Sequence, residues 1–121
     1  LMLTGVMYLS ILFHTHAADL SEDMLILSQN LNIISKSEND KEIITALGKM
    51  YNAAVDAMEE IPESSLYKDL NISSYRNDMN KLIDVINKTK NEALEGDLSN
   101  VKRSIKEMME IRDSAHKNID K

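Results

Sequence analysis

The chain has 121 residues, of which 20 are acidic and 14 basic, so its formal net charge is −6 and its length suits one domain. It contains no cysteine, which excludes disulfides, thiolate metal sites, iron–sulfur clusters and thioether-linked haem. An acidic balance without a basic run argues against nucleic acid or an anionic membrane as the partner. With one Pro, three Gly, four Tyr and one Phe, the composition favours helices over sheets.

Residues 1–17 differ from the rest because they contain no Asp, Glu, Lys or Arg. Their apolar centre is followed by small residues that end in Ala17, as in an export signal cleaved after that residue. The apolar run is shorter than the roughly 20 residues of a membrane-spanning helix. The pattern predicts a signal peptide at 1–17 and a mature domain at 18–121. We expect the signal to be N-terminally truncated, since it starts at Leu1 without a basic segment; a buried first helix is the alternative.

Four amphipathic stretches follow the leader, each with apolar residues at helical spacing. The first stretch is capped by Asp19 or Ser21, and its seam positions are Leu20, Met24, Leu27, Leu31 and Ile34. The second carries its apolar stripe from Ile43 to Met58 and stops near Pro62.

The third stretch begins its stripe at Tyr75 and ends at Glu95, with Gly96 placed to terminate the helix. The fourth begins near Asp97 or Ser99, either of which could cap it. Together the four stretches predict an all-α fold, an antiparallel up-down-up-down four-helix bundle. In this arrangement the first and last helices are neighbours and the two chain ends meet at one end of the bundle.

His116 is the one histidine of the expected mature domain, because His14 and His16 belong to the leader. It follows the apolar stripe of the last helix, and Met24 lies in the seam of the first helix. At about 1.5 Å per residue, both lie on the order of 8 Å inside the same end of the bundle. A thioether and an imidazole form an axial pair for haem iron. The spacing is equally compatible with core packing, in which His116 hydrogen-bonds a neighbour and Met24 fills space.

Particular residue combinations recur along nearly the whole chain after Ala17. They are Ala18–Met24, Leu27, Asn30-Leu31, Ile34, Ala46–Met50, Ala53–Ala57, Tyr75-Arg76, Leu82-Ile83, Glu95-Gly96 and Arg112–His116. In this combination the chain resembles the soluble periplasmic cytochrome b-562 family. The two end motifs are specific as a pair, with the histidine in place and the expected cleavage before Ala18, where that family is cleaved.

The resemblance implies one non-covalent haem b per chain, with Met24 and His116 as its axial ligands. It implies that the protein is a periplasmic electron carrier and not an enzyme. The pocket residues that it implies are Leu20, Leu27, Leu31, Met50, Tyr75, Met79 and Arg112, with Pro62 at the edge. Arg112 lies one turn before His116, where it either shields the haem edge or is solvated.

The expected partners are unidentified redox proteins, with no nucleic acid and no membrane after signal cleavage, and we expect a monomer. Some residues depart from the family pattern. Tyr75 and Met79 stand where the family has phenylalanine, and Asp120 stands where a basic residue is usual. The covalent relatives, the cytochromes c-prime, would have cysteines at the positions of Arg112 and Ala115, so haem must be held here without thioether bonds.

Two other function classes remain as alternatives. One is a haem-free exported helical bundle that acts as a binding module for a protein or a metal ion. The other is a hydrolase or a peroxidase. A hydrolase lacks a base–nucleophile set, since His116 lies on a helix stripe. A peroxidase needs an open axial position on the iron, which a Met/His pair does not leave.

Overall fold

The computed structural model describes residues 20–60 and 72–120, and the side chains within these ranges except those of residues 72 and 118–120. The expected leader at 1–17 and Pro62 lie outside the described residues. The described chain forms four helices, which are α2 (Leu20–Lys36), α3 (Asp40–Glu59), α4 (Ile72–Leu94) and α5 (Leu98–Asp120).

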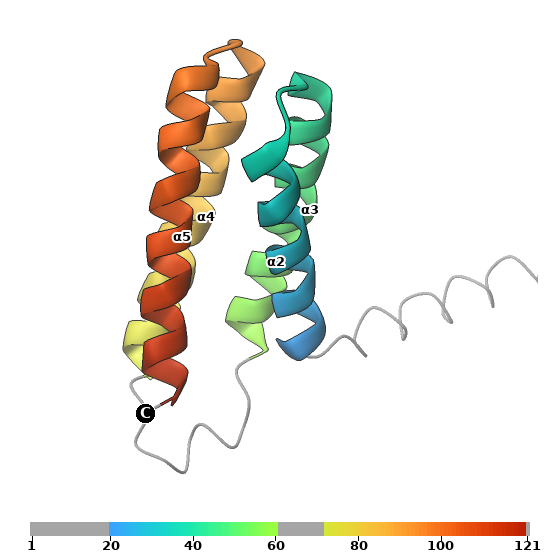
Figure 1. Ribbon diagram of the computed structural model, residues 1–121. Coiled ribbons are helices and arrows are strands. Elements are labelled where there is room, and N and C mark those ends of the chain that lie inside the picture. Colours follow the sequence, from blue (N-terminus) through green and yellow to red (C-terminus); the bar gives the residue numbers. More distant parts are fainter. Residues whose placement is uncertain (1–19, 61–71, 121) are drawn as a thin grey trace, which may run out of the picture.

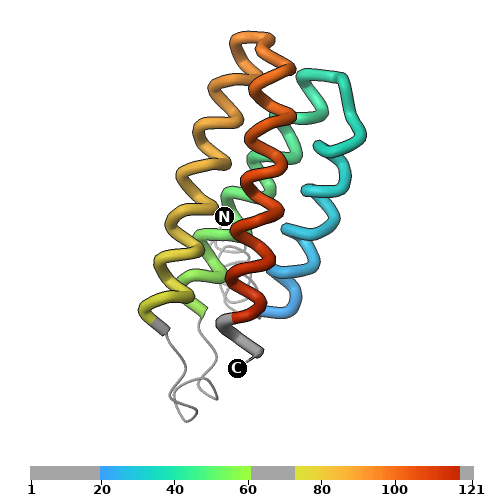
Figure 2. The backbone as a smooth tube through the Cα atoms, turned by 60° about the vertical axis from the view of Figure 1, so that its left-hand side comes forward, coloured from blue at the N-terminus to red at the C-terminus, as the bar shows by residue number. Residues whose placement is uncertain are grey.

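The four helices run alternately up and down and form one antiparallel bundle (Figure 1). The predicted fold class is therefore confirmed. The start of α2 and the end of α5 lie at the same end of the bundle, as the sequence predicts (Figures 1 and 2). The third helix starts at Ile72, earlier than the stripe that begins at Tyr75 indicates, and Ser73 and Ser74 separate these two residues.

The short links between paired helices are stabilised by capping. The side chain of Asn39 accepts a hydrogen bond of 3.1 Å from the backbone N–H of Glu42, which caps the start of α3. Of the two caps predicted for α5, Asp97 is the one formed, and its carboxylate accepts from the backbone N–H of Asn100 at 3.2 Å. These caps fix where the second helix of each pair begins.

Gly96 ends α4 as the sequence predicts. Its φ of 74° lies in the left-handed region, which costs glycine little. The N–H of Gly96 donates to the carbonyl of Ala93 at 3.1 Å and the N–H of Asp97 to that of Glu92 at 2.9 Å. This is the hydrogen-bond pattern of a Schellman motif, and it turns the chain directly into α5.

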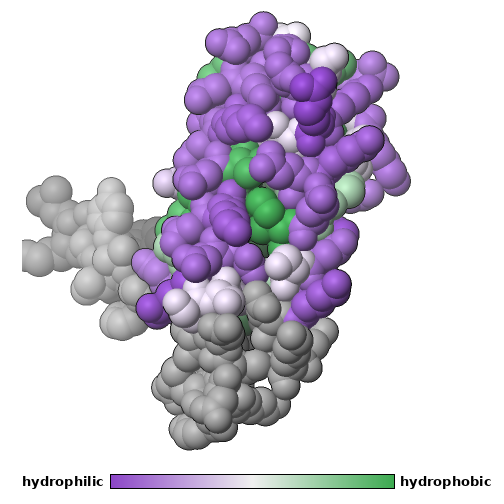
Figure 3. Space-filling model, turned by 90° about the vertical axis from the view of Figure 1, so that its left-hand side faces the viewer, coloured by the Kyte–Doolittle hydropathy of each residue, from purple (hydrophilic) through white to green (hydrophobic). Residues whose placement is uncertain are grey.

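The core lies along the axis of the bundle and is filled by the apolar stripes of all four helices. Its completely buried large side chains include Ile34, Ile43, Leu47, Met50, Met79, Ile86, Val101 and Met108. Hydrophilic side chains cover most of the outer side formed by α4 and α5, with a smaller apolar patch near its middle (Figure 3). None of the described helices combines the length and the apolar character that crossing a membrane requires.

The helices do not pack equally well on one another. Extensive contacts join α2 to α3, α3 to α4 and α4 to α5, whereas α2 and α5 touch at few points. The bundle is therefore two tight hairpins that share the α3–α4 side and are nearly separate along α2 and α5. This loose edge determines where a ligand could enter.

Candidate functional site

A cavity of about 330 Å³ opens between α2 and α5. A volume of this size falls within the range of small-molecule sites, which is about 300–1,000 Å³. The lining residues are Met24, Leu27, Ser28, Leu31, Met50, Met79, Leu82, Met108, Ile111, Arg112, Asp113, Ala115 and His116. Every helix contributes to the lining, and most of the surface is apolar.

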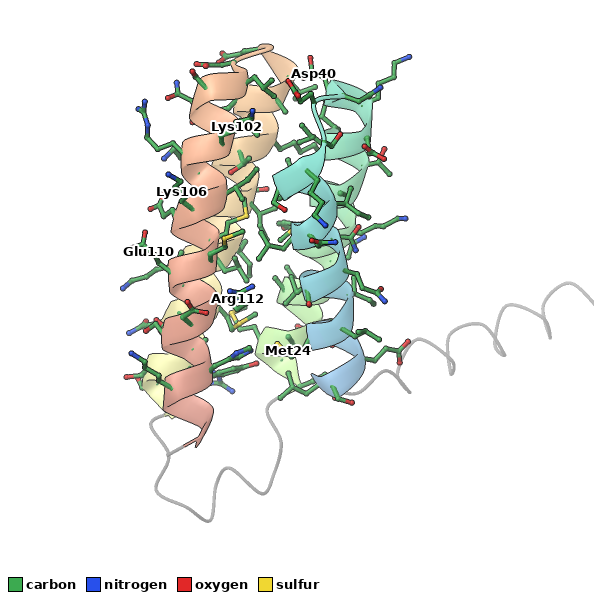
Figure 4. The ribbon with its side chains drawn as sticks, in the orientation of Figure 1. Met24, Asp40, Lys102, Lys106, Glu110 and Arg112 are labelled. Carbon is green, nitrogen blue, oxygen red and sulfur yellow. The ribbon has the colours of Figure 1, made fainter. Side chains whose placement is uncertain are left out.

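Met24 and His116 line this cavity from opposite sides, Met24 from α2 and His116 from α5. Met24 is partly buried and lies on α2 across the gap from Arg112 of α5 (Figure 4). His116 is exposed, unlike a histidine packed inside a core. The structure thus brings a thioether and an imidazole to one cavity, which is the donor pair that the sequence singles out.

Each of the four helices supplies one methionine to the lining of the cavity. Met50 of α3, Met79 of α4 and Met108 of α5 are only 1%, 2% and 0% exposed. All three belong to the lining of the cavity. Unbranched thioether side chains adapt to irregular apolar shapes, so this part of the lining can adjust to an apolar ligand.

An ion pair lies where the cavity meets solvent. The guanidinium of Arg112 contacts a carboxylate oxygen of Asp113 at 3.2 Å. Both side chains are substantially exposed, at 41% and 64%, so the pair contributes little to stability. Its position gives the mouth of an otherwise apolar cavity a polar rim.

The cavity contains most of the expected pocket residues. Leu27, Leu31, Met50, Met79 and Arg112 are all part of its lining. The lining does not include the other two expected residues. Leu20 is partly buried against the core, and Tyr75 is buried with its hydroxyl donating a 3.2 Å hydrogen bond to the carbonyl of Ala57.

Sequence reasoning did not assign six lining residues to the pocket, namely Ser28, Leu82, Met108, Ile111, Asp113 and Ala115. A signal for three of them was available on the last helix. Met108, Ile111 and Ala115 follow one another at spacings of three and four, the spacing of one helix face, which also carries Arg112. Extending that face back from His116 would have found them.

Asp23 is a buried carboxyl group beside the site, directly before Met24 in the sequence. It is 3% exposed. Its pKa is raised from 3.8 to about 7, first by burial and then by a hydrogen bond and the negative charge of Asp56. Glu22 and Glu60 raise the pKa further through their charges. The first turn of α2 therefore holds a carboxyl group that binds its proton unusually tightly.

Comparison with known proteins gives two matches. Residues 19–119 match the family model described as "Cytochrome b562". The chain is 42% identical over 117 residues to a protein of Yersinia pestis named "Probable soluble cytochrome b562 1", an alignment that covers 94% of this chain and 92% of that protein. The matched residues include all of α2, α3 and α4 and all but the last residue of α5, and so both Met24 and His116. The chain therefore belongs to the cytochrome b562 family of haem-binding electron-transfer proteins.

Proposed function

We propose that this protein binds one haem b without covalent attachment, with Met24 and His116 as axial ligands, and that it carries electrons in the periplasm. The observation that carries the proposal is the shared cavity, which Met24 reaches from α2 and His116 from α5. Haem, when bound, supplies an iron that gains or loses one electron. The donor set fits it, since a thioether and an imidazole are a known axial pair and the remaining lining is mostly apolar.

The residues around the proposed ligands have separate roles. Met50, Met79 and Met108 exclude water from the inner surface because they are almost completely buried. Two protein ligands would saturate the iron, so the site favours electron transfer over chemistry on a substrate at the metal. A thioether ligand favours the reduced state and raises the potential relative to a pair of histidines.

Haemin titration of the apo-protein, followed by visible absorption, tests the ligand assignment. The wild type is expected to give a six-coordinate low-spin spectrum. Met24→Ala and His116→Ala should each lose it. Met58→Ala is the matched control, because Met58 packs against the core from α3 and is not part of the cavity lining.

Each other outcome has a definite meaning. An unchanged low-spin spectrum in either ligand variant would assign that axial position to another residue. Failure of the wild type to bind haemin would favour the haem-free binding module instead. The periplasmic location rests on the export pattern of residues 1–17. Expression of the precursor, followed by fractionation and N-terminal sequencing, should give a periplasmic protein that starts at Ala18.

A further inference from the structure

One end of the cavity between α2 and α5 contains three soft donor side chains. It is the end of the bundle at which α2 and α4 begin and α5 ends (Figures 1 and 2). Met24 and His116 each lie four residues from the end of their helix there, and Met79 lies seven residues after the start of α4. At about 1.5 Å per residue, these positions are roughly 6 and 10 Å from the helix ends. All three side chains line the same cavity of about 330 Å³.

The directions of the helices separate Met79 from the other two buried methionines. Helical side chains lean toward the N-terminus of their own helix. Met79 therefore leans toward the end that holds Met24, because α4 starts there. His116 leans the opposite way, toward the level of Met79, because α5 ends there. Met50 and Met108 lie further in and lean away from this end, since α3 and α5 start at the other one.

The three donors have the chemistry of a soft metal site. Two are thioether sulfurs and one is an imidazole nitrogen, and soft sulfur ligands select Cu(I) among the biological metals. Among the described side chains, no three of His, Cys, Asp and Glu are grouped so as to hold a metal ion, so a site for harder metals has no such support there. The group differs from those sites because methionine supplies most of its donors.

The surroundings of the three donors suit a single positive charge. Arg112, which also lines the cavity, is paired with Asp113 at 3.2 Å, so the charges at the cavity mouth cancel. Met79 is only 2% exposed, Met24 is partly buried and His116 is exposed. An ion between them would therefore enter from the solvent side and be shielded by the thioethers, whose flexible chains can turn toward it.

We propose that the haem-free protein binds one Cu(I) ion through the Sδ atoms of Met24 and Met79 and a ring nitrogen of His116. The ion enters and leaves as Cu(I), so no electron is transferred in binding. This inference goes beyond the proposed function but shares Met24 and His116 with it. Haem iron would use both of these ligands, so haem and Cu(I) should exclude each other.

Competition with a chromophoric Cu(I) chelator, without oxygen and with ascorbate present, measures the affinity of the full mature chain. We expect one Cu(I) per chain without haem and none when haem is bound. Met79→Leu should weaken binding at least about tenfold, because it removes one sulfur and keeps an apolar side chain of similar size. Met58→Leu is the control and should bind as the wild type does, since Met58 packs against the core outside the cavity lining.

A second measurement needs no variant. Ag⁺ has the charge and the softness of Cu(I) and is not oxidised in air, so it can be titrated while the methionine methyl signals are followed by NMR. The signals of Met24 and Met79 should shift most. Those of Met50 and Met108 serve as internal controls, because both line the cavity away from the proposed site. Circular dichroism of Met79→Leu and Met58→Leu establishes that each is folded.

Several outcomes would overturn the proposal. They are no Cu(I) binding by the wild type, wild-type affinity in Met79→Leu, an equal loss in Met58→Leu, and Ag⁺ shifts at Met50 or Met108 as large as that at Met79. A low-spin haem spectrum in a wild type that does not bind Cu(I) would sink this inference alone. Cu(I) binding by a wild type that takes up no haemin would sink only the proposed function.

Discussion

The hydroxyl of Tyr75 donates a 3.2 Å hydrogen bond to the carbonyl oxygen of Ala57 and so joins the start of α4 to the end of α3. Burial, with a smaller effect from the charge of Asp23, raises the pKa of Tyr75 to about 12. The phenol therefore stays protonated and remains a donor over the whole working range of pH.

Replacing Tyr75 with phenylalanine should lower the free energy of unfolding by about 1 kcal/mol, the typical net value of one buried hydrogen bond. Urea unfolding of the haem-free protein measures this change. Tyr51→Phe is the control, since Tyr51 is 39% exposed and should lose almost nothing. Equal losses in the two variants would mean that the Tyr75 bond is not the cause.

Asp23 should make the protein less stable as the pH rises. Its pKa is about 7 in the folded protein against a model value of 3.8, so between these values the folded state holds more protons than the unfolded state. The contribution of Asp23 to stability is then greatest below about pH 4, falls as the pH rises towards about 7, and is constant above that. Asp23→Asn should flatten this profile and stabilise the protein by about 1–3 kcal/mol at pH 8. Urea unfolding in EDTA at several pH values measures it; an unchanged profile in the variant would contradict the assignment.

The two glycines of the described chain should respond to alanine in opposite ways. An added Cβ meets nothing within 4 Å at Gly48 or Gly96, so only the backbone decides. Gly96→Ala should cost about 1 kcal/mol because φ is 74° there. Gly48→Ala, inside α3, should gain about 0.5–1 kcal/mol. Thermal unfolding of both variants checks the signs, and stabilisation by Gly96→Ala would contradict the left-handed turn.

The cap of α5 can be tested by comparing its two sequence-level candidates. Asp97→Ala should lower the free energy of unfolding by about 1 kcal/mol, since it removes the acceptor for the N–H of Asn100. Ser99→Ala should have little effect, because Ser99 is exposed inside the first turn of the helix. Chemical unfolding of both variants measures the difference, and the reverse order would move the cap to Ser99.

Haem should stabilise the bundle by binding only its folded form. At a free haemin concentration of 100 times the dissociation constant, the gain is about 2.7 kcal/mol. The double variant Met24→Ala/His116→Ala should lose most of this gain while keeping its haem-free stability within about 1 kcal/mol, because neither side chain is fully buried. Melting curves with and without haemin provide the measurement. An equal gain in the double variant would show that these side chains do not hold the haem.

The sequence predicts the helices and their order well because the apolar stripes are regular. Leu27, Leu31 and Ile34 keep the spacing of a bundle seam, and all three are buried. Gly96 ends its helix where expected, since a left-handed residue after a helix favours glycine. The start of α4 was less predictable, because Ser73 and Ser74 interrupt the apolar stripe between Ile72 and Tyr75.

The cavity was predicted in part, because a stripe tells which face of a helix is buried but not how far apart two helices lie. Leu20 and Tyr75 share the buried faces with the lining residues, yet the cavity lining excludes both. The burial of Asp23 could not be foreseen for a similar reason. An aspartate in a first helical turn is ordinarily exposed and stabilises the helix end, whereas here Asp23 is buried.

The weak packing between α2 and α5 has a consequence for how the bundle opens locally. Opening along that edge separates two intact hairpins and breaks few side-chain contacts, whereas opening along α3 and α4 would divide the core. Amide hydrogens should therefore exchange faster in α2 and α5 than in α3 and α4. A flat ligand could therefore enter between α2 and α5 while all four helices stay folded.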